Sequence, residues 1–318
     1  MTDLYSSARA FLADYGLHPA PDAYLAHGYV DLFLAAWRGA SSPRLDLAAR
    51  WALWTWRTDD LIDTELRDAA PGAADQLVMQ LLDVLYGKAA EHTDHPTVRA
   101  LADLVGHTAP VMPRDWWTRY QAELDAWLNA AADKLSTYVR PGRTPSLREY
   151  LLLRPVDGGM LLAAMWCELA LDCVTPDWSS LLVHKLLDAF SAVGTLTNDL
   201  SSKDVGDTFT AQAALSHSVG LPPQEARQEV HEQLNAERTR FWFMTTAVRD
   251  EARLTDSDAL HPVTATFAGA LDRFLRALAD WTRTSSRYTE SQVAAVGAGV
   301  TLAPTARSRP AAEVAPCR

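Results

Sequence analysis

Apolar residues recur at spacings of three and four along nearly the whole of this 318-residue chain, and the interruptions between the periodic stretches are short. Such spacing places apolar side chains on one face of an α-helix, whereas a strand facing a core would show strict alternation. One stripe of this kind contains Trp117, Tyr120, Leu124, Trp127 and Leu128. The periodicity therefore predicts an all-α protein.

Short clusters of Pro, Gly, Ser and Asp separate the periodic stretches, and none of them is long enough to act as an interdomain linker. They lie at residues 18–22, 41–43, 70–72, 140–142, 175–177 and 261–262. The clusters leave about ten helices and no internal repeat, which favours one helical domain over residues 1–295. Residues 296–318 are rich in Ala and Pro and are predicted to form a flexible tail.

The composition is that of a globular protein without a polyanionic partner. The chain is 48% hydrophobic and 22% charged, and its net charge of -11 argues against binding to nucleic acid or an anionic membrane. Cys167, Cys173 and Cys317 lack the spacing of a disulfide framework or a zinc site. The N-terminus does not resemble a secretory signal, and the sequence has no run of about 18 apolar residues. We therefore expect a cytoplasmic protein with no stable membrane insertion.

An acidic segment follows a Trp-rich helical stretch and is the first candidate site. Asp59, Asp60 and Asp63 lie within five residues, and Asp59 and Asp63 are one helical turn apart, so they can face the same ion. Hard oxygen ligands suit Mg²⁺, and negative charge late in a helix opposes the macrodipole unless a cation compensates it. The alternative is a solvated acidic helix end.

A second candidate ends the long helical stretch that begins near Ser180. Asn198 and Ser202 are again one turn apart, and the residues above them on that face are small, namely Gly194, Thr195 and Ser191. This face either lines a cavity or packs closely against a neighbouring helix, with Asn198 and Ser202 capping the helix end.

Two further segments carry groups that can bind an anion. Arg154 and Asp157 lie in a segment in which Pro155, Gly158 and Gly159 are expected to interrupt a helix, so that Arg154 and the exposed backbone can hold an anion. The alternative is an ordinary loop in which Arg154 and Asp157 form a surface ion pair. Arg287 and Tyr288 follow the last long helical stretch, and both can donate to phosphate oxygens.

In their order along the chain, the acidic segment, the segment of Arg154, the segment of Asn198 and the segment of Arg287 resemble a bacterial class I terpene synthase. The resemblance extends from Trp51 to Tyr288. It implies a helical bundle around a central apolar cavity, three Mg²⁺ ions with Mn²⁺ as an alternative, and an isoprenoid diphosphate as substrate. Homodimers are common in this fold class, but the sequence indicates no interface. Each matching residue has an implied role, which is metal binding for Asp59, Asp60, Asp63, Asn198 and Ser202, diphosphate sensing for Arg154, linker and effector for Asp157 and Gly158, and diphosphate binding for Arg287 and Tyr288.

The chain departs from this pattern where the family places a metal-binding Glu, because the position one turn after Ser202 is Gly206. Asp207 is then the expected third ligand, and it can reach the metal only if the helix unwinds near Gly206. The lysine that usually precedes this Glu has no counterpart at its usual place, and Lys203, which lies nearby, is expected to reach the diphosphate instead.

The implied reaction is metal-triggered ionisation of farnesyl or geranylgeranyl diphosphate, followed by cyclisation of the carbocation and release of diphosphate. Trp56 and Trp281 are expected to line the hydrocarbon pocket, where aromatic faces stabilise positive charge. Two alternatives remain, a non-catalytic diphosphate-binding protein of the same fold and a chain-elongating prenyltransferase. The second resembles this sequence less, because the chain has one aspartate-rich motif rather than two.

Overall fold

The computed structural model describes residues 3–88, 95–202, 208–254 and 260–288, and within these ranges the chain is helical without a strand. The helices are α1 (Leu4–Asp14), α2 (Pro21–Leu25), α3 (Tyr29–Ala36), α4 (Ser42–Asp60), η1 (Leu61–Glu65), α5 (Ala73–Leu85), α6 (Pro96–Thr108), α7 (Arg114–Lys134), η2 (Leu135–Val139), α8 (Leu147–Asp157), α9 (Met160–Leu171), η3 (Asp177–Ser179), α10 (Leu181–Ser201), α11 (Ala211–Val219), α12 (Pro223–Glu251) and α13 (Pro262–Thr284).

The predicted all-α class is confirmed, and each predicted break lies between two helices or at the start of one. The described part has thirteen α-helices rather than about ten, because α2, α3 and α11 are too short to give a clear periodic pattern. Proline occupies the first turn of α2, α4, α6, α12 and α13, where its missing N–H costs no hydrogen bond. The predicted tail, residues 296–318, lies outside the described residues.

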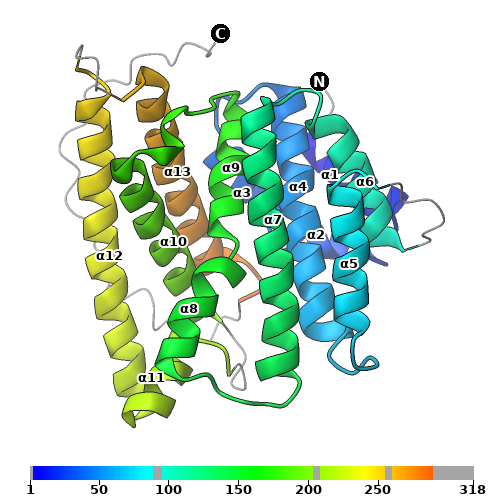
Figure 1. The fold of residues 1–318 in the computed structure, drawn as a ribbon, viewed down its shortest axis with the longest axis vertical. Coiled ribbons are helices and arrows are strands. Elements are labelled where there is room, and N and C mark those ends of the chain that lie inside the picture. The colour runs from blue at the N-terminus through cyan, green and yellow to red at the C-terminus, as the bar shows by residue number, and fades with distance from the viewer. Residues whose placement is uncertain (1–2, 89–94, 203–207, 255–259, 289–318) are drawn as a thin grey trace.

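The long helices lie side by side, with α12 at one edge of the bundle and α5 and α6 at the other (Figure 1). Helices α4, α7, α10 and α13 run in the same direction, so their C-terminal ends meet at the lower end of the view, where α8 also lies. This end of the bundle carries the candidate site. None of the helices in the described ranges is long and apolar enough to cross a membrane.

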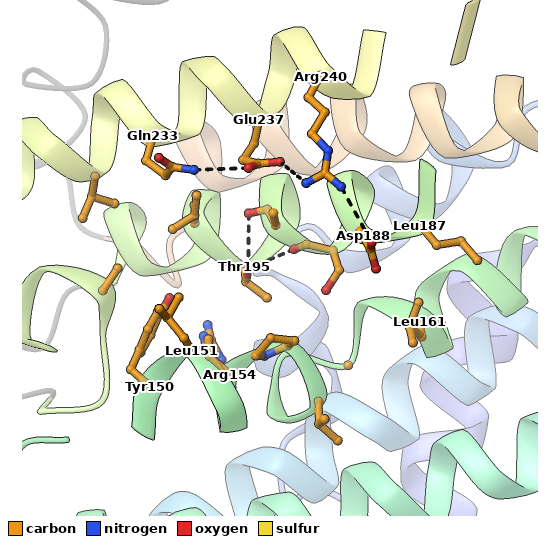
Figure 2. Close-up of a pocket in the computed structure, with 18 of the residues that line it drawn as sticks. Tyr150, Leu151, Arg154, Leu161, Leu187, Asp188, Thr195, Gln233, Glu237 and Arg240 are labelled. Atoms are coloured by element: carbon orange, nitrogen blue, oxygen red, sulfur yellow. Dashed lines mark hydrogen bonds and ion pairs between the residues drawn. The ribbon is translucent and has the colours of Figure 1, made fainter. Parts of the chain in front are cut away.

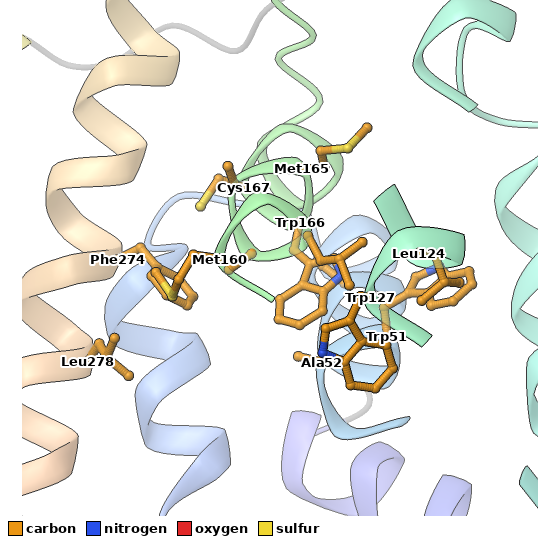
Figure 3. Close-up of a cluster of buried hydrophobic side chains, with 14 of the residues drawn as sticks. Trp51, Ala52, Leu124, Trp127, Met160, Met165, Trp166, Cys167, Phe274 and Leu278 are labelled. Atoms are coloured by element: carbon orange, nitrogen blue, oxygen red, sulfur yellow. The ribbon is translucent and has the colours of Figure 1, made fainter. Parts of the chain in front are cut away.

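Large aromatic and aliphatic side chains fill the bundle between α4, α7, α9 and α13 (Figure 3). Four residues of the predicted stripe on α7 are buried, whereas the fifth, Trp117, is only partly buried and its neighbour Trp116 is fully buried. Buried indole N–H groups find acceptors, as Trp51 does at Thr108 (2.8 Å) and Trp166 at the Tyr120 hydroxyl (3.0 Å). These two hydrogen bonds therefore satisfy the buried indoles and tie α4 to α6 and α9 to α7.

Glu168 is a fully buried carboxylate in α9. It accepts hydrogen bonds from the indoles of Trp116 (2.8 Å) and Trp178 (2.9 Å) and from the backbone N–H of Thr175 (2.9 Å). Burial raises the pKa of Glu168 to about 7, against the lowering effect of these donors and of Arg119. The residue is a structural node far from the helix ends that carry the acidic segment.

Candidate active site at the C-terminal ends of five helices

Three cations and five carboxylates meet where α4, α7, α8, α10 and α13 end. The C-terminal end of a helix carries partial negative charge, so cations are favoured there. Lys134 is the last residue of α7, Arg154 lies in the last turn of α8, and Arg287 follows the end of α13. The carboxylates that face them belong to Asp59, Asp60, Asp63, Asp157 and Asp199.

The acidic segment spans the end of α4 and the π-helical turn η1. Asp59 and Asp63 do face one cation, the ammonium of Lys134, at 3.7 Å and 2.8 Å. Asp60 points elsewhere and pairs with Arg287. The three carboxylates are therefore each paired with a protein cation, and the segment is not a solvated helix end.

Asp60 and Arg287 form a bidentate ion pair across the site. The Arg287 guanidinium donates to the two oxygens of Asp60 at 2.7 and 3.2 Å and to the Tyr29 hydroxyl at 2.8 Å, and the Tyr24 hydroxyl donates to Asp60 at 3.1 Å. Burial raises the pKa of Tyr29 to about 12 even though the neighbouring Arg287 lowers it, so Tyr29 stays a neutral hydroxyl. These contacts fix the segment after α13 against α3 and α4.

The break between α8 and α9 differs from the sequence expectation. Pro155 does not interrupt the helix, because α8 continues through it to Asp157 and turns only at Gly158 and Gly159, the latter with φ of 63°. A Cβ on Gly158 would lie 2.3 Å from Cγ2 of Thr195, so only glycine fits against α10. The pair of Arg154 and Asp157 is no surface pair, since the two side chains are 12% and 0% exposed.

Arg154 joins the break to α10. Its guanidinium donates to Asp157 (2.9 Å), to Asp199 (2.6 and 3.0 Å) and to the amide oxygen of Asn198 (3.0 Å). The amide nitrogen of Asn198 donates in turn to the Tyr288 hydroxyl at 3.0 Å. Burial disfavours the charge of Arg154, but Asp199 and Asp157 outweigh it and raise its pKa well above the usual value.

The second predicted metal motif is described only in part. Helix α10 ends at Ser201, and Ser202 already has an extended backbone with ψ of 132°. The helix thus ends before the turn in which the family pattern has its glutamate. Lys203, Gly206 and Asp207 lie outside the described residues, so the assignments of Lys203 and Asp207 remain predictions.

Two residues of the site were not predicted from the sequence. Lys134 lies seven residues after Trp127, on the stripe that otherwise carries large apolar side chains, and a lysine on such a stripe is the signal that would have identified it. Asp199 stands inside the Asn-Asp segment, but its role depends on tertiary contacts. It is 1% exposed and also accepts hydrogen bonds from the Tyr150 hydroxyl (2.6 Å) and the Ala211 N–H (2.9 Å).

The charges of the site fit a divalent cation. When all are ionised, five carboxylates face three protein cations and exceed them by two negative charges. Desolvation raises the pKa of Asp59 to about 7, opposed by Lys134 and reinforced by Asp63, Asp157 and Asp60. The oxygens of Asp59, Asp63 and Asn198 are hard donors of the kind that Mg²⁺ prefers. The residues present therefore suit this metal.

An aromatic cluster lies next to the acidic segment. The ring of Trp56, one turn before Asp59 and Asp60, stacks on Trp281 with centroids 5.7 Å apart and on Phe33 at 5.7 Å, and it lies 5.1 Å from Tyr29. Trp281 meets Tyr288 edge-on at 5.5 Å. The two tryptophans predicted to line the hydrocarbon pocket thus contact each other. They also contact Tyr29, which accepts a hydrogen bond from Arg287, and Tyr288, which follows Arg287 in the chain.

A cavity of about 850 Å³ lies on the other side of α10, between α8, α9 and α12 (Figure 2). Both alternatives left open for the small-residue face of α10 occur, because Ser191 and Thr195 line this cavity whereas Gly194 packs against Met160. Arg154 reaches its wall, and Asp188 and Arg240 pair on the α12 side at 3.7 Å. Asp59, Asp60 and Asp63 do not line this cavity.

Comparison with known proteins agrees with this geometry. Residues 50–240, more than half of the chain, match the protein family described as "Terpene synthase family 2, C-terminal metal binding". Pristinol synthase of Streptomyces pristinaespiralis is 24% identical over 277 residues, which are 82% of this chain and 72% of that protein.

Solved structures of two bacterial enzymes have the same fold. Linalool/nerolidol synthase from Streptomyces clavuligerus, in complex with 2-fluorogeranyl diphosphate, is 22% identical to this chain and superposes with a TM-score of 0.77. The superposition covers 88% of this chain and 97% of that enzyme's chain. Germacradien-4-ol synthase from Streptomyces citricolor is 19% identical, with a TM-score of 0.76 and coverage of 88% and 93%. By the family match over residues 50–240, this chain belongs to the terpene synthase family, whose members form terpenes from isoprenyl diphosphates.

Proposed function

We propose that the protein is a class I terpene cyclase that ionises farnesyl or geranylgeranyl diphosphate with the help of Mg²⁺ and cyclises the resulting carbocation. One observation carries the proposal. The four segments singled out in the sequence belong to a connected set of ion pairs and hydrogen bonds, from Asp60 through Arg287 and its neighbour Tyr288 to Asn198, Arg154 and Asp157. Lys134 completes the ring by joining Asp157 to Asp63 and Asp59.

Asp59, Asp60, Asp63, Asn198 and Ser202 would hold the metal ions, with Asp207 as the predicted further ligand. Bound Mg²⁺ would act as a Lewis acid that neutralises charge growing on the departing diphosphate. Mn²⁺ is expected to substitute because it accepts the same oxygen ligands. The excess of negative charge at these helix ends supports this assignment.

Arg154, Arg287 and Tyr288 would bind the diphosphate. The two guanidinium groups present planar forks that match phosphate oxygens, and their pairing with Asp60, Asp157 and Asp199 keeps them directed at the site before substrate arrives. Fixed donors of this kind stabilise developing charge without further reorganisation. Gly158 would contribute its backbone, because the absence of a side chain lets α8 approach α10.

Trp56 and Trp281 would face the hydrocarbon chain. Cation–π attraction contributes roughly 0.5 to 2 kcal/mol for each aromatic face near a cation. Their position beside Asp59, Asp60 and Tyr288 favours this cluster over the cavity near α12, because no aspartate of the acidic segment lines that cavity.

The proposal is tested by incubating the protein with Mg²⁺ and, separately, geranyl, farnesyl and geranylgeranyl diphosphate, and by analysing the extract by gas chromatography with mass spectrometry. We expect a cyclic hydrocarbon or alcohol from one substrate and its loss in Asp59→Ala and Asn198→Ala. Ala192→Leu, which adds bulk to the cavity near α12, is the matched control and should leave the product unchanged. A folded protein that yields no cyclic product from any substrate would refute the proposal and favour a diphosphate-binding protein.

A further inference from the structure

Lys134 lies at the centre of the acidic side of the site, although no motif of the sequence includes it. Its ammonium is 2.8 Å from Asp63, 2.9 Å from Asp157 and 3.7 Å from Asp59. We propose that Lys134 is a built-in counter-ion that positions these three carboxylates and competes with the first divalent metal ion for the oxygens of Asp59 and Asp63. The inference rests on the function proposed above, because it concerns how the same site acquires its metal.

Two irregular turns bring these groups together. Helix α4 passes into the π-helical turn η1 directly after Asp60, and α7 passes into the π-helical turn η2 directly after Lys134. The two turns contact each other, and α7 contacts η1. Single π-helical turns are uncommon and occur frequently at functional sites. Here they place an ammonium from α7 against carboxylates of a segment about seventy residues earlier in the chain.

The surroundings keep Lys134 charged. Its side chain is 8% exposed, and such burial by itself disfavours an ammonium, but Asp157, Asp63 and Asp59 outweigh it and raise the pKa of Lys134 well above the usual value. Asp157 does not depend on Lys134 alone, since Arg154 donates to its other oxygen at 2.9 Å. Asp59 and Asp63, by contrast, belong to the acidic segment expected to hold metal.

An ammonium in this position occupies the space in which a metal would use the same oxygens. A divalent cation bound there would lie close to Lys134, and like charges at short range repel strongly in a partly buried site. Among the described residues, no group of three or more His, Cys, Asp or Glu side chains is arranged to hold an ion. The carboxylates of Asp59, Asp63 and Asp157 surround the ammonium of Lys134 instead of an open space that could admit a metal ion.

A purely structural role for Lys134 makes a different prediction. A lysine that only tied α7 to η1 and α8 would stabilise the fold, and its loss would loosen the carboxylates and leave metal affinity equal or weaker. A competing lysine lowers metal affinity, so its loss must raise it. Metal affinity without substrate therefore distinguishes the two roles.

The experiment measures Mn²⁺ binding by electron paramagnetic resonance, without diphosphate, in the wild type and in Lys134→Met. Methionine retains a long flexible side chain without the charge. We expect Lys134→Met to bind the first Mn²⁺ at least tenfold more tightly, and Lys134→Arg, which retains the charge, to bind it like the wild type. Lys185→Met is the control for net charge, because Lys185 is exposed on α10 and pairs with Asp188; it should leave the affinity unchanged.

The outcomes separate this inference from the proposed function. If the wild type binds Mn²⁺ and a folded Lys134→Met binds it no more tightly, the competition is refuted while the proposed metal site stands. If neither protein binds Mn²⁺ without diphosphate, the competition is refuted, and the proposed function is judged separately by the product assay, because substrate phosphates commonly complete the coordination of such an ion. Should Lys134→Met fail to fold, the double variant K134M/D157N, which removes one cation and one buried carboxylate together, carries the same expectation of tighter binding.

Discussion

Replacing Gly158 with alanine tests how closely α8 approaches α10 at the site. The added Cβ would lie 2.3 Å from Cγ2 of Thr195 and 3.0 Å from the backbone oxygen of Arg154. The first distance is more than about 1 Å short of an ordinary carbon–carbon contact of about 3.5 Å, so either Thr195 or α8 must move. Overpacking of this kind costs about 1 to 3 kcal/mol of unfolding free energy. The shift would also displace Arg154 from its partners, so we expect activity to fall more than stability.

Thr195→Ser removes the Cγ2 that causes the clash and retains the hydroxyl that donates to the Ser191 carbonyl at 2.9 Å. The double variant G158A/T195S should therefore recover most of the lost stability in urea unfolding. We expect an interaction free energy of at least about 1 kcal/mol in the double-mutant cycle, because the two residues are in direct contact. Strictly additive single effects would show that the contact between Gly158 and Thr195 does not limit the approach of the two helices.

Three further substitutions probe separate parts of the molecule. Asp199→Ala removes the acceptor that the buried donors of Arg154, Tyr150 and Ala211 share. In urea titration, we expect it to lower the unfolding free energy by about 3 to 5 kcal/mol. The control Asp188→Ala, at an exposed ion pair, should cost less than about 1 kcal/mol. Trp56→Leu should lower kcat by roughly 2- to 30-fold and change the product profile, while the exposed Trp242→Leu should do neither; an unchanged profile in Trp56→Leu would contradict the assignment. The pKa of Glu168 is raised to about 7 in the folded protein, against about 4.3 in the unfolded chain. Its contribution to the unfolding free energy is therefore complete below about pH 4.3 and is lost as pH rises through about 7. Urea unfolding at pH 5 and pH 8 should measure this loss as roughly 3 kcal/mol, and the loss should be absent in Glu168→Gln.

The all-helical class was predictable because it depends on a local pattern. Spacings of three and four persist over enough residues in each long helix to exclude alternation, and proline and glycine mark the ends. The short helices α2 and α3 escaped prediction because five and eight residues give too few turns for a period to appear. Pro155 was misread because its missing hydrogen bond lies in the last turn of α8, where tertiary contacts of Arg154 and Asp157 hold the helix together.

The site was predictable only where its residues form local motifs. Asp59, Asp60 and Asp63 stand within one segment, and Arg287 and Tyr288 are neighbours, so each group could be found by spacing. Lys134 has no such partner in sequence, and Asp199, although it is next to Asn198, lies on a different face of the helix from Asn198 and Ser202. Their importance arises from contacts across about seventy and forty-five residues, which only the folded chain displays.

The balance of charge at the site leads to a last prediction about metal removal. With all groups ionised, five carboxylates exceed three protein cations by two negative charges. The diphosphate group is itself an anion. At an effective dielectric constant of about 20, two unit charges 4 Å apart interact by about 4 kcal/mol. Asp60 and Asp199 therefore weaken the attraction of Arg287 and Arg154 for an anion, while they keep the two guanidinium groups in place. We therefore expect inorganic diphosphate to bind at least about tenfold more weakly in EDTA than in Mg²⁺ when followed by calorimetry. Equal binding in the two conditions would mean that the arginines alone overcome the carboxylates, and the acidic segment would then need a role other than holding metal.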